Sequence, residues 1–262
     1  MVKHDLQGES ATLGQRDRGF YTPTMQIIAT PEWDASATRP EAAHWAEARR
    51  HMVDSQLRPN RVTDPLLLAA MGELPRHLFA PASLTARAHA DADLPLPGGR
   101  AMLQPMAIAR LLQLLALRDG DRLLIVGAGT GYSAAIAASL GARVVALEQD
   151  EALVAVARRV LPGLLPPGAI ELVCAPLPGG HPAGAPYDAI LIEGEVPAVP
   201  PVIAGQLAEG GRLATILAGG PRGRGPRAVL GRRASGGFSL TDAFDCATAA
   251  LRTFQPNPGF VL

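Results

Sequence analysis

The chain has 262 residues, and 24 lysines and arginines balance 24 aspartates and glutamates, so the formal net charge is zero. Hydrophobic residues make up 48% of the chain and charged residues 18%, which excludes a fully disordered protein. The balanced charge provides no global field that would draw the protein to nucleic acid or to an anionic membrane, so neither partner is expected. At this length we expect one large domain, or one domain with an appended segment.

Two cysteines, Cys174 and Cys246, are too few for a disulfide framework. We expect two buried free thiols, although the pair could also form a disulfide. No stretch of about 18 consecutive apolar residues is present, and residues 1–20 lack the apolar core of a signal peptide. These features predict a cytoplasmic protein.

The first part of the chain predicts an arm followed by helices. Residues 1–40 are polar and without a sustained period, which is typical of a loosely ordered N-terminal arm. Residues 41–98 predict a helical segment, with helix formers over 41–57. A second helix begins at Thr63-Asp64-Pro65, where a capping side chain precedes an early proline, and ends near Gly72.

A regular alternation of strands and helices begins after a Pro/Gly loop at residues 94–99. Short turns between alternating elements predict a parallel sheet with helices on both faces. The last two strand-like segments flank a Gly-rich turn at 234–237, which indicates an antiparallel hairpin. The predicted ranges are a helix from 105 to about 118, a strand at 122–126, a glycine turn at 127–131, a helix at 132–140, a strand at 143–147, a helix at 151–160, strands at 170–173 and 187–192, a helix at 200–207, and strands at 212–217, 227–233 and 238–244.

The most informative segment is the glycine turn after the strand at 122–126, which reads Gly-Ala-Gly-Thr-Gly-Tyr over residues 127–132. Without Cβ atoms, glycines let the backbone turn tightly and approach a ligand, and amides at the start of the helix at Tyr132 favour negative groups. Glu148 follows the next strand, where an acid can accept hydrogen bonds from the ribose hydroxyls of an adenosine ligand. This pattern predicts a nucleoside cofactor, and an ordinary strand-to-helix turn is the alternative.

The spacing of the glycines indicates which nucleoside is bound. The dinucleotide fingerprint Gly-x-Gly-x-x-Gly would need a glycine at position 132, where Tyr132 stands, and the third glycine comes one residue early. This spacing favours S-adenosylmethionine over a nicotinamide dinucleotide.

Several segments together resemble the protein-L-isoaspartate O-methyltransferase family. The similarity covers about residues 48–217, is weaker over the C-terminal hairpin, and does not include the first 40 residues. The matching segments are Gly127-Ala-Gly-Thr-Gly-Tyr-Ser133, Met52-Val-Asp-Ser-Gln-Leu57, Val62-Thr-Asp-Pro65, Leu74-Pro-Arg-His-Leu-Phe-Ala-Pro81, Gln104-Pro105, Tyr187-Asp-Ala-Ile190 and Glu209-Gly-Gly211.

The resemblance implies a class I methyltransferase fold, that is, a Rossmann-like, doubly wound and mostly parallel sheet with an antiparallel C-terminal hairpin and a helical N-terminal segment. It implies a methyltransferase domain over residues 99–262 that uses S-adenosyl-L-methionine, releases S-adenosyl-L-homocysteine, and methylates a carboxylate at isoaspartyl residues of damaged proteins. The cofactor-binding candidates are Gly127, Ala128, Gly129, Thr130, Gly131, Tyr132, Glu148, Gln149 and Glu193.

The segment that the resemblance places at the substrate departs from the family pattern. The family reads Gly-Gln-Thr-Ile-Ser-Gln-Pro there, and this chain reads Gly-Arg-Ala-Met-Leu-Gln-Pro over residues 99–105. Leu103 therefore stands at the serine position and Ala101 at the threonine position, so no catalytic residue is assigned. Gln104 and Arg100 are nearby candidates: Arg100 could bind a carboxylate bidentately, although we favour a solvated loop cation.

The cofactor side departs from the family pattern too. Ile125 replaces an acid before the first glycine, and a Gly-Asp-Gly segment whose acid lies by the adenine is replaced around Cys174-Ala175-Pro176.

Other charged residues have less specific interpretations. Glu193 and Glu195 lie at the end of a strand, where open parallel sheets bind ligands, and Glu193 is either a ligand contact or a solvated acid. The histidines show no metal-ligand spacing, so no metal is expected. The basic cluster is interpreted as a solvated Gly/Pro/Arg loop rather than a phosphate or RNA contact; it comprises Arg222, Arg224, Arg227, Arg232 and Arg233.

Three functions stay open at this point. The first is an isoaspartyl-type methyltransferase, and the second is a methyltransferase that acts on another acceptor, for which Met102 and Leu103 favour a small apolar molecule. The third is a non-catalytic binding protein that keeps the fold.

Overall fold

The computed structural model describes residues 39–219 and 225–255. The expected N-terminal arm at 1–40 therefore lies outside the described residues, except that its last two residues begin helix α1.

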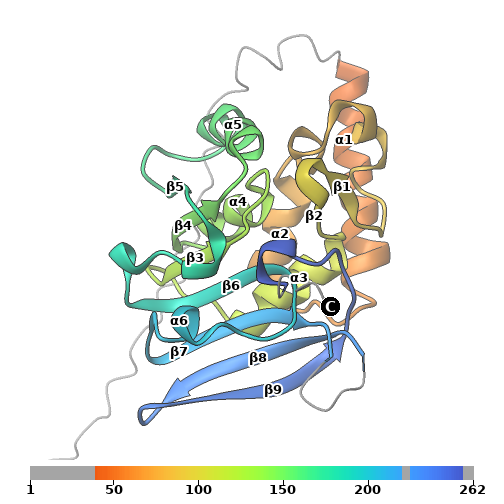
Figure 1. The fold of residues 1–262 in the computed structure, drawn as a ribbon. Coiled ribbons are helices and arrows are strands. Elements are labelled where there is room, and N and C mark those ends of the chain that lie inside the picture. The colour runs from red at the N-terminus through yellow and green to blue at the C-terminus, as the bar shows by residue number, and fades with distance from the viewer. Residues whose placement is uncertain (1–38, 220–224, 256–262) are drawn as a thin grey trace, which may run out of the picture.

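Within the described residues, seven strands form one sheet in the order β5-β4-β3-β6-β7-β8-β9 (Figure 1). The first five of these strands run parallel, and β8 and β9 continue the sheet as an antiparallel hairpin, as predicted. Strand order reverses between β3 and β6, and such switch points are where open α/β sheets bind ligands. The strands are β3 (Arg122–Val126), β4 (Arg143–Glu148), β5 (Ile170–Cys174), β6 (Tyr187–Val196), β7 (Leu207–Leu217), β8 (Arg227–Ala234) and β9 (Gly237–Asp245).

Both faces of the central strands are buried, which explains their continuous apolar sequence. Successive side chains of a strand point to opposite faces. Leu123 and Ile125 of β3 therefore join one hydrophobic core, whereas Leu124 and Val126 join the other. The first core contains residues of α3 (Pro105–Leu115), α4 (Tyr132–Ser139) and α5 (Glu151–Val160), and the second contains Ile203 of α6 (Pro201–Ala204).

The N-terminal helices share the first of these cores. Helix α1 (Arg39–Met52) continues as a π-helical turn (Val53–Leu57), and both match the helix predicted at 41–57. Helix α2 (Pro65–Glu73) starts where the capping signal predicts, because the Asp64 carboxylate accepts the N–H groups of Leu66 and Leu67 at 2.9 and 3.2 Å.

The structure corrects the prediction at several elements, one of which is β7, since it begins at Leu207 and not at the predicted position 212. The loop expected at 94–99 is a short antiparallel hairpin of β1 (Leu94–Leu96) and β2 (Arg100–Met102), whose prolines and glycines concealed it. Strand β6 continues four residues past the predicted end at 192, through a register shift between Leu191 and Glu195. The helix expected at 200–207 ends at Ala204, because Gly205 follows it and β7 begins at Leu207.

The two cysteines differ in burial. Both are free thiols, but only Cys246 is buried, so the expectation for Cys174 is wrong: Cys174 lies exposed at the end of the edge strand β5. In the part of the chain that the structure describes, no helix combines the length and apolarity that a bilayer crossing would need.

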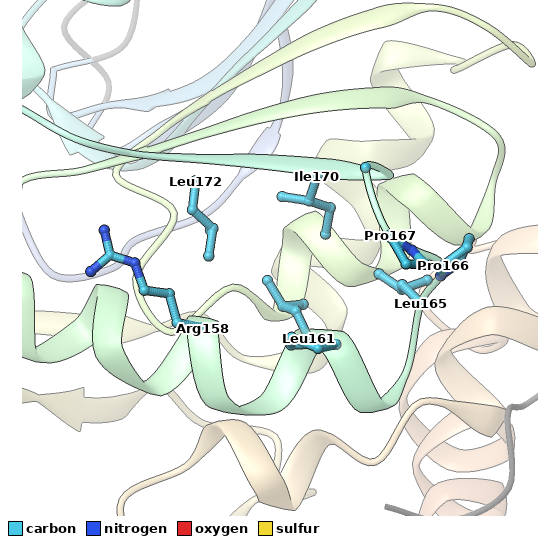
Figure 2. A pocket seen from close by; sticks show the side chains of 9 residues that line it. Arg158, Leu161, Leu165, Pro166, Pro167, Ile170 and Leu172 are labelled. Carbon is cyan, nitrogen blue, oxygen red and sulfur yellow. The ribbon is translucent and has the colours of Figure 1, made fainter.

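A surface pocket of about 280 Å³ lies between α5 and β5 (Figure 2). It is mostly apolar, and its lining includes Leu161, Leu165, Ile170 and Leu172, with Arg158 at one side. Because the pocket is built from the end of α5 and the start of β5, it lies away from the carboxyl ends of the strands.

Candidate functional site

Three predicted site residues lie at the same level of neighbouring strands, two of them within a strand and one directly after one. Val126 of β3 is paired with Leu147 of β4 and with Ile192 of β6. Gly127, Glu148 and Glu193 come directly after these three paired residues. The structure therefore brings the three together at the carboxyl edge of the sheet. This edge is also the switch point of the sheet.

The glycine turn has a backbone that only glycine adopts without strain. Gly127, Gly129 and Gly131 have φ angles of 82°, 56° and 94°. Helix α4 begins directly afterwards at Tyr132, and its first N–H groups have no partner within the helix. The buried Thr130 hydroxyl has no hydrogen-bond partner among the described residues. The turn therefore presents donors that suit a polar ligand.

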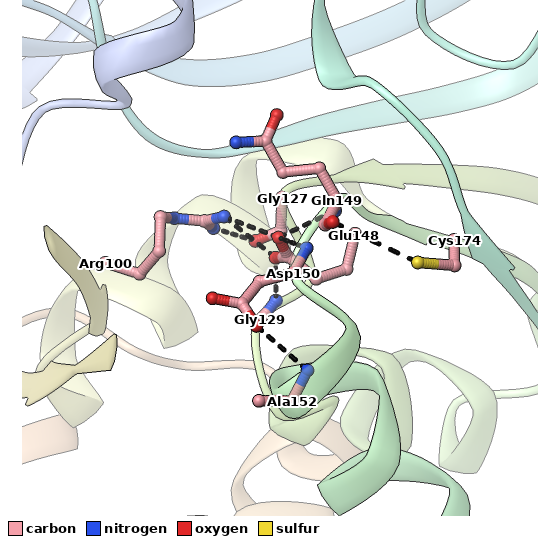
Figure 3. Close-up of polar contacts among 8 residues, drawn as sticks. All are labelled: Arg100, Gly127, Gly129, Glu148, Gln149, Asp150, Ala152 and Cys174. Atoms are coloured by element: carbon pink, nitrogen blue, oxygen red, sulfur yellow. Dashed lines mark hydrogen bonds and ion pairs between the residues drawn. The ribbon is translucent and has the colours of Figure 1, made fainter. Parts of the chain in front are cut away.

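Glu148 ends β4 and is the most fully bonded acid of the site (Figure 3). It is only 2% exposed. One carboxylate oxygen, Oε2, accepts the Gly129 N–H at 2.8 Å, and Oε1 accepts the N–H groups of Gln149 and Asp150 at 2.8 and 3.1 Å. These bonds tie the predicted ribose-binding acid to the glycine turn.

Arg100 is a buried partner of Glu148 and not the solvated loop cation that we favoured from the sequence. Its side chain points from β2 toward the end of β4 (Figure 3), and the residue is 7% exposed. Its Nη1 donates to both carboxylate oxygens of Glu148 at 2.8 Å, and Nη2 donates to the Gly127 carbonyl at 2.8 Å. The β1–β2 hairpin brings this cation back to the edge of the sheet. This contact could not be predicted, because a loop was expected at 94–99.

Glu193 is buried beside this pair, which excludes the solvated acid considered from the sequence. Its carboxylate accepts a hydrogen bond from the Ser133 hydroxyl of α4. Burial raises the pKa of Glu193 to about 7, and the Ser133 hydrogen bond and the Arg100 charge only partly oppose this shift. Glu195 has a different role, because its backbone bonds to Ala249 and Leu251 of the segment that follows β9.

The segment at 99–105 places a buried apolar residue at the position that the resemblance assigns to a serine. Leu103 is 2% exposed and belongs to the first core. Its carbonyl accepts Nη2 of the fully buried Arg76 at 2.6 Å. The backbone N–H of Gln104 donates to Asp93 at 2.8 Å, which fixes the start of α3. The described structure therefore supplies no hydroxyl at position 103.

Two of the predicted cofactor residues are oriented differently from the rest. The ring of Tyr132 packs against Phe79, with centroids 5.5 Å apart, and lies 4.7 Å from the Arg76 guanidinium, so it faces the N-terminal segment. Only the backbone of Tyr132 belongs to the turn. The second residue is Gln149, whose side chain is exposed above Glu148 (Figure 3). Ala128, by contrast, is buried within the turn at 3% exposure.

A C-terminal segment that no sequence motif predicted covers the glycine turn. Leu251 follows β9 and bonds back to the end of β6, where its N–H donates to the Glu195 carbonyl at 2.8 Å. A Cβ on Gly127 would lie 3.5 Å from Leu251, and one on Gly194 would lie 2.6 Å from it. No periodicity marks this segment. Arg76 and Asp93, which fix the segment at 99–105, were also missed, although Arg76 stands in a segment matched to the family.

Two of the three described arginines of the basic cluster make polar contacts with neighbouring parts of the fold. Arg227 pairs with Asp242 and Asp245 across the β8–β9 hairpin. Arg233 donates to the carbonyls of Gly205 and Leu207, and Arg232 is exposed on β8. These three lie in β8, which matches the strand predicted at 227–233, so the interpretation of the cluster as a loop is wrong for them. The other two members, Arg222 and Arg224, lie outside the described residues.

A family model for "Protein-L-isoaspartate(D-aspartate) O-methyltransferase (PCMT)" matches residues 47–235. The chain belongs to this family. A protein-L-isoaspartate O-methyltransferase of Methylorubrum populi is 41% identical over 196 residues, which are 74% of this chain and 90% of that protein. One of Herpetosiphon aurantiacus is 41% identical over 169 residues, 64% of this chain and 75% of that protein.

Solved structures agree with this family at the level of the fold. A protein-L-isoaspartate O-methyltransferase superposes with a TM-score of 0.66 at 24% identity, over 77% of this chain and 65% of that one, just under two thirds of its length. A Plasmodium falciparum protein-L-isoaspartate O-methyltransferase, in complex with S-adenosyl-L-homocysteine, gives 0.64 at 19% identity, over 78% of this chain and 98% of that one.

Enzymes of this PCMT family use S-adenosyl-L-methionine, and the described residues fit that cofactor. Glu148 can accept hydroxyl donors at the end of β4, and the unpartnered Thr130 hydroxyl is a buried donor at the turn. No cluster of metal-ligating side chains occurs in residues 39–219 and 225–255, and methyl transfer from a sulfonium needs none. Arg100 competes for the same acceptor, because it already donates to both oxygens of Glu148.

Proposed function

We propose that this protein is a protein-L-isoaspartate O-methyltransferase that methylates a carboxylate of isoaspartyl residues in damaged proteins or peptides. When bound, S-adenosyl-L-methionine supplies an electrophilic methyl group on a sulfonium, and S-adenosyl-L-homocysteine is released. The observation that carries the proposal is the position of Glu148 against the glycine turn at the switch point of the sheet. Family membership supports the same function.

On the cofactor side, the proposal assigns binding to residues of the turn and the strand ends. Glu148 accepts the ribose hydroxyls, and the backbone of residues 127–132 lies against the cofactor. Glu193, close to Glu148 and Arg100, adds an acid whose pKa is raised to about 7 by burial. The buried Leu251 and Leu96 exclude water from this edge of the site.

On the acceptor side, the main task of the protein is positioning. A carboxylate is ionised at neutral pH and is already a nucleophile, so a strong general base is not needed. Holding two reactants in line can lower a barrier by about 7–11 kcal/mol. The segment at 99–105 is the proposed acceptor wall, and Gln104 is its polar candidate, held by the bond from its backbone to Asp93.

A methyl-transfer assay tests the function. Radiolabelled S-adenosyl-L-methionine is incubated with the purified full chain and an isoaspartyl peptide, and the same peptide with normal aspartate is the control. We expect label to enter only the isoaspartyl peptide as a base-labile ester. Glu148→Gln should reduce this labelling mainly through the cofactor KM, because an amide accepts only on one side. Equal labelling of both peptides, or of neither, would contradict the proposal.

A second candidate is methyl transfer to another acceptor, which the buried Leu103 favours. The variant Leu103→Ser restores the hydroxyl of the family pattern. If the unchanged chain methylates the isoaspartyl peptide, repair is its own activity. If the chain binds S-adenosyl-L-homocysteine but only Leu103→Ser methylates the peptide, isoaspartyl repair is not the chain's own activity and the first candidate is overturned.

The proposal also specifies the setting of the reaction. The partners are isoaspartyl proteins or peptides and, under the second candidate, a small molecule. The reaction takes place in the cytoplasm, which the two free cysteines support. The cofactor-binding domain begins at residue 99, and the helical segment before it covers the same core.

A further inference from the structure

The Glu148 carboxylate has no free acceptor position. A carboxylate offers about four lone-pair sites on its two oxygens. Oε1 is bonded by Arg100 and by the N–H groups of Gln149 and Asp150, and Oε2 by Arg100 and the Gly129 N–H. Any ligand hydroxyl that donates to Glu148 must therefore replace one of these donors.

Arg100 is the donor that can leave. The other three are backbone N–H groups, which are fixed by the turn and by the start of α5. Arg100 belongs to the two-stranded β1–β2 sheet, and isolated hairpins of such short strands are marginally stable. It also directly follows Gly98 and Gly99, whose φ angles of 67° and 71° give the backbone freedom to turn.

The guanidinium of Arg100 is also incompletely satisfied where it lies. Its Nε is buried and has no hydrogen-bond partner among the described residues. The same guanidinium crowds the turn, because a Cβ on Gly127 would come within 2.9 Å of Nη2. The ion pair with Glu148 therefore holds Arg100 at the place where a ligand of the turn would lie.

We propose that Arg100 competes with the cofactor for Glu148 and thereby determines the affinity of the site for S-adenosyl-L-methionine and S-adenosyl-L-homocysteine. The inference rests on the proposed function, in which Glu148 receives the ribose hydroxyls. Binding requires Arg100 to release both oxygens, and the apparent affinity falls by the fraction of molecules in which it has done so. The family pattern that we compared has glutamine at this position, so the competition is a feature of this chain.

Calorimetry with S-adenosyl-L-homocysteine distinguishes this competitor from a simple support for Glu148. The variants are Arg100→Gln and Arg100→Ala, and the matched control is Arg143→Gln, which removes the same charge at the exposed start of β4. A competitor predicts about ten-fold tighter binding for both Arg100 variants, equivalent to about 1.4 kcal/mol, with the control unchanged. A support predicts weaker binding. Unchanged or weaker binding by the Arg100 variants overturns the proposal.

Thermal unfolding of the same proteins shows that the variants are folded and gives a second measurement. Without ligand, the Arg100 variants should unfold at a lower temperature than the unchanged chain, because they leave Glu148 buried without its cation. Saturating S-adenosyl-L-homocysteine should stabilise them more than it stabilises the unchanged chain. If an alanine variant does not fold, Arg100→Gln and Arg100→Lys provide the comparison, and lysine should give intermediate affinity.

The results separate this inference from the proposed function. If the unchanged chain binds S-adenosyl-L-homocysteine and methylates the isoaspartyl peptide, but the Arg100 variants do not bind more tightly, only the inference fails. If no protein in the series binds S-adenosyl-L-homocysteine, both fail.

Discussion

Two buried acids of the site lie close together but have different surroundings. Glu148 has an arginine and three backbone N–H groups on its carboxylate, whereas Glu193 has one hydroxyl bond, from Ser133. Burial is therefore the dominant influence on Glu193 and raises its pKa from an ordinary value of 4.5 to about 7. The folded protein keeps Glu193 protonated over a pH range in which the unfolded chain has lost the proton.

This difference predicts a pH-dependent stability that Glu193→Gln should remove. Between pH 4.5 and 7 the folded state binds more protons than the unfolded state, so the stability falls as the pH rises through this window. Glutamine cannot ionise. At pH 8 the variant should be more stable than the unchanged chain, by up to about 3 kcal/mol, and near pH 4.5 the two should be similar. Thermal unfolding at a series of pH values measures this.

The control for this prediction is Glu47→Gln, which changes an exposed glutamate of α1. It should leave the pH dependence intact. A Glu193→Gln protein with the same pH dependence as the unchanged chain would show that Glu193 titrates normally.

Single residues of the site were predictable only where their distance along the sequence from a recognisable motif indicated their role. Glu148 could be found because it lies at a characteristic distance from the glycines, at the end of the next strand. The role of Arg100 could not, because its partner is 48 positions away and a small hairpin brings them together. The charge state of Glu193 depends on burial, which no local pattern reports.

At the scale of elements, the glycine turn combines a backbone requirement with close packing. Gly127 and Gly120 have nearly equal φ angles, 82° and 80°. A Cβ on Gly127 would meet Arg100 at 2.9 Å, whereas one on Gly120 would meet no atom within 4 Å. The pair therefore separates the cost of backbone strain from the cost of crowding.

We expect Gly120→Ala to lower the free energy of unfolding by about 1–2 kcal/mol, the usual cost of left-handed backbone. Gly127→Ala should cost more, because the guanidinium must also move. This excess should shrink when Gly127→Ala is combined with Arg100→Ala. Urea unfolding of the unchanged chain, Gly127→Ala, Arg100→Ala and the double variant measures the coupling. Equal costs at the two glycines would contradict the crowding.

The docking of α1 also depends on protonation. Trp45 of α1 is stacked on His77, with ring centroids 4.3 Å apart and planes at 9°, and lies near His89. Burial, helped by the nearby charge of Arg49, lowers the pKa of His77 to about 4, and burial likewise lowers that of His89 to about 4. Both rings are neutral in the folded protein at a pH where the unfolded chain would protonate them.

Acidification should therefore loosen this contact. The unfolded chain binds more protons between pH 6.5 and 4, so the stability falls as the pH decreases through that range. We expect the fluorescence of Trp45 to change across it, measured in a Trp33→Phe protein so that Trp45 is the only tryptophan left. His77→Gln should reduce the pH dependence, and His51→Gln, at an exposed position of α1, should not. An identical response from both variants would contradict the role of His77.

The elements themselves were largely predictable. Apolar runs identified the central strands, and the proline and aspartate at 64–65 marked the start of α2. The β1–β2 hairpin was missed because glycine and proline are usually signals for loops. The end of β6 was missed because its two glutamates interrupt the apolar run, although Glu193 is buried and the backbone of Glu195 is bonded to the segment after β9.

At the scale of the whole molecule, the sheet is covered by chain segments that are distant in the sequence. The N-terminal helices share the core of one face, and the segment after β9 returns to the other, where Leu251 joins the second core at 2% exposure (Figure 1). The mostly parallel sheet with its antiparallel hairpin was predicted, but the order of the strands was not, since the hydrophobic pattern alone does not say which strands are neighbours. The return of the C-terminal segment to the sheet was predicted neither by the family resemblance nor by the hydrophobic pattern.

Leu251→Ala should therefore destabilise the protein as a core substitution does. The side chain packs against Gly127 and Gly194, so its loss should cost about 2–5 kcal/mol. That cost corresponds to a decrease of roughly 2–4 °C in Tm per kcal/mol for a chain of this size. Leu66→Ala is the matched control because Leu66 is 56% exposed. Similar melting temperatures for the two variants would show that the C-terminal segment is not part of the core.

The position of Leu251 also sets the order in which the site can be completed during synthesis. A ribosome releases the glycine turn and Glu148 well before it releases Leu251, which covers the turn. A nascent or truncated chain therefore has the residues that anchor the cofactor but lacks the wall that shields it from water. We expect the cofactor to recognise finished chains, so that it stabilises the protein after translation and contributes little to the early steps of folding.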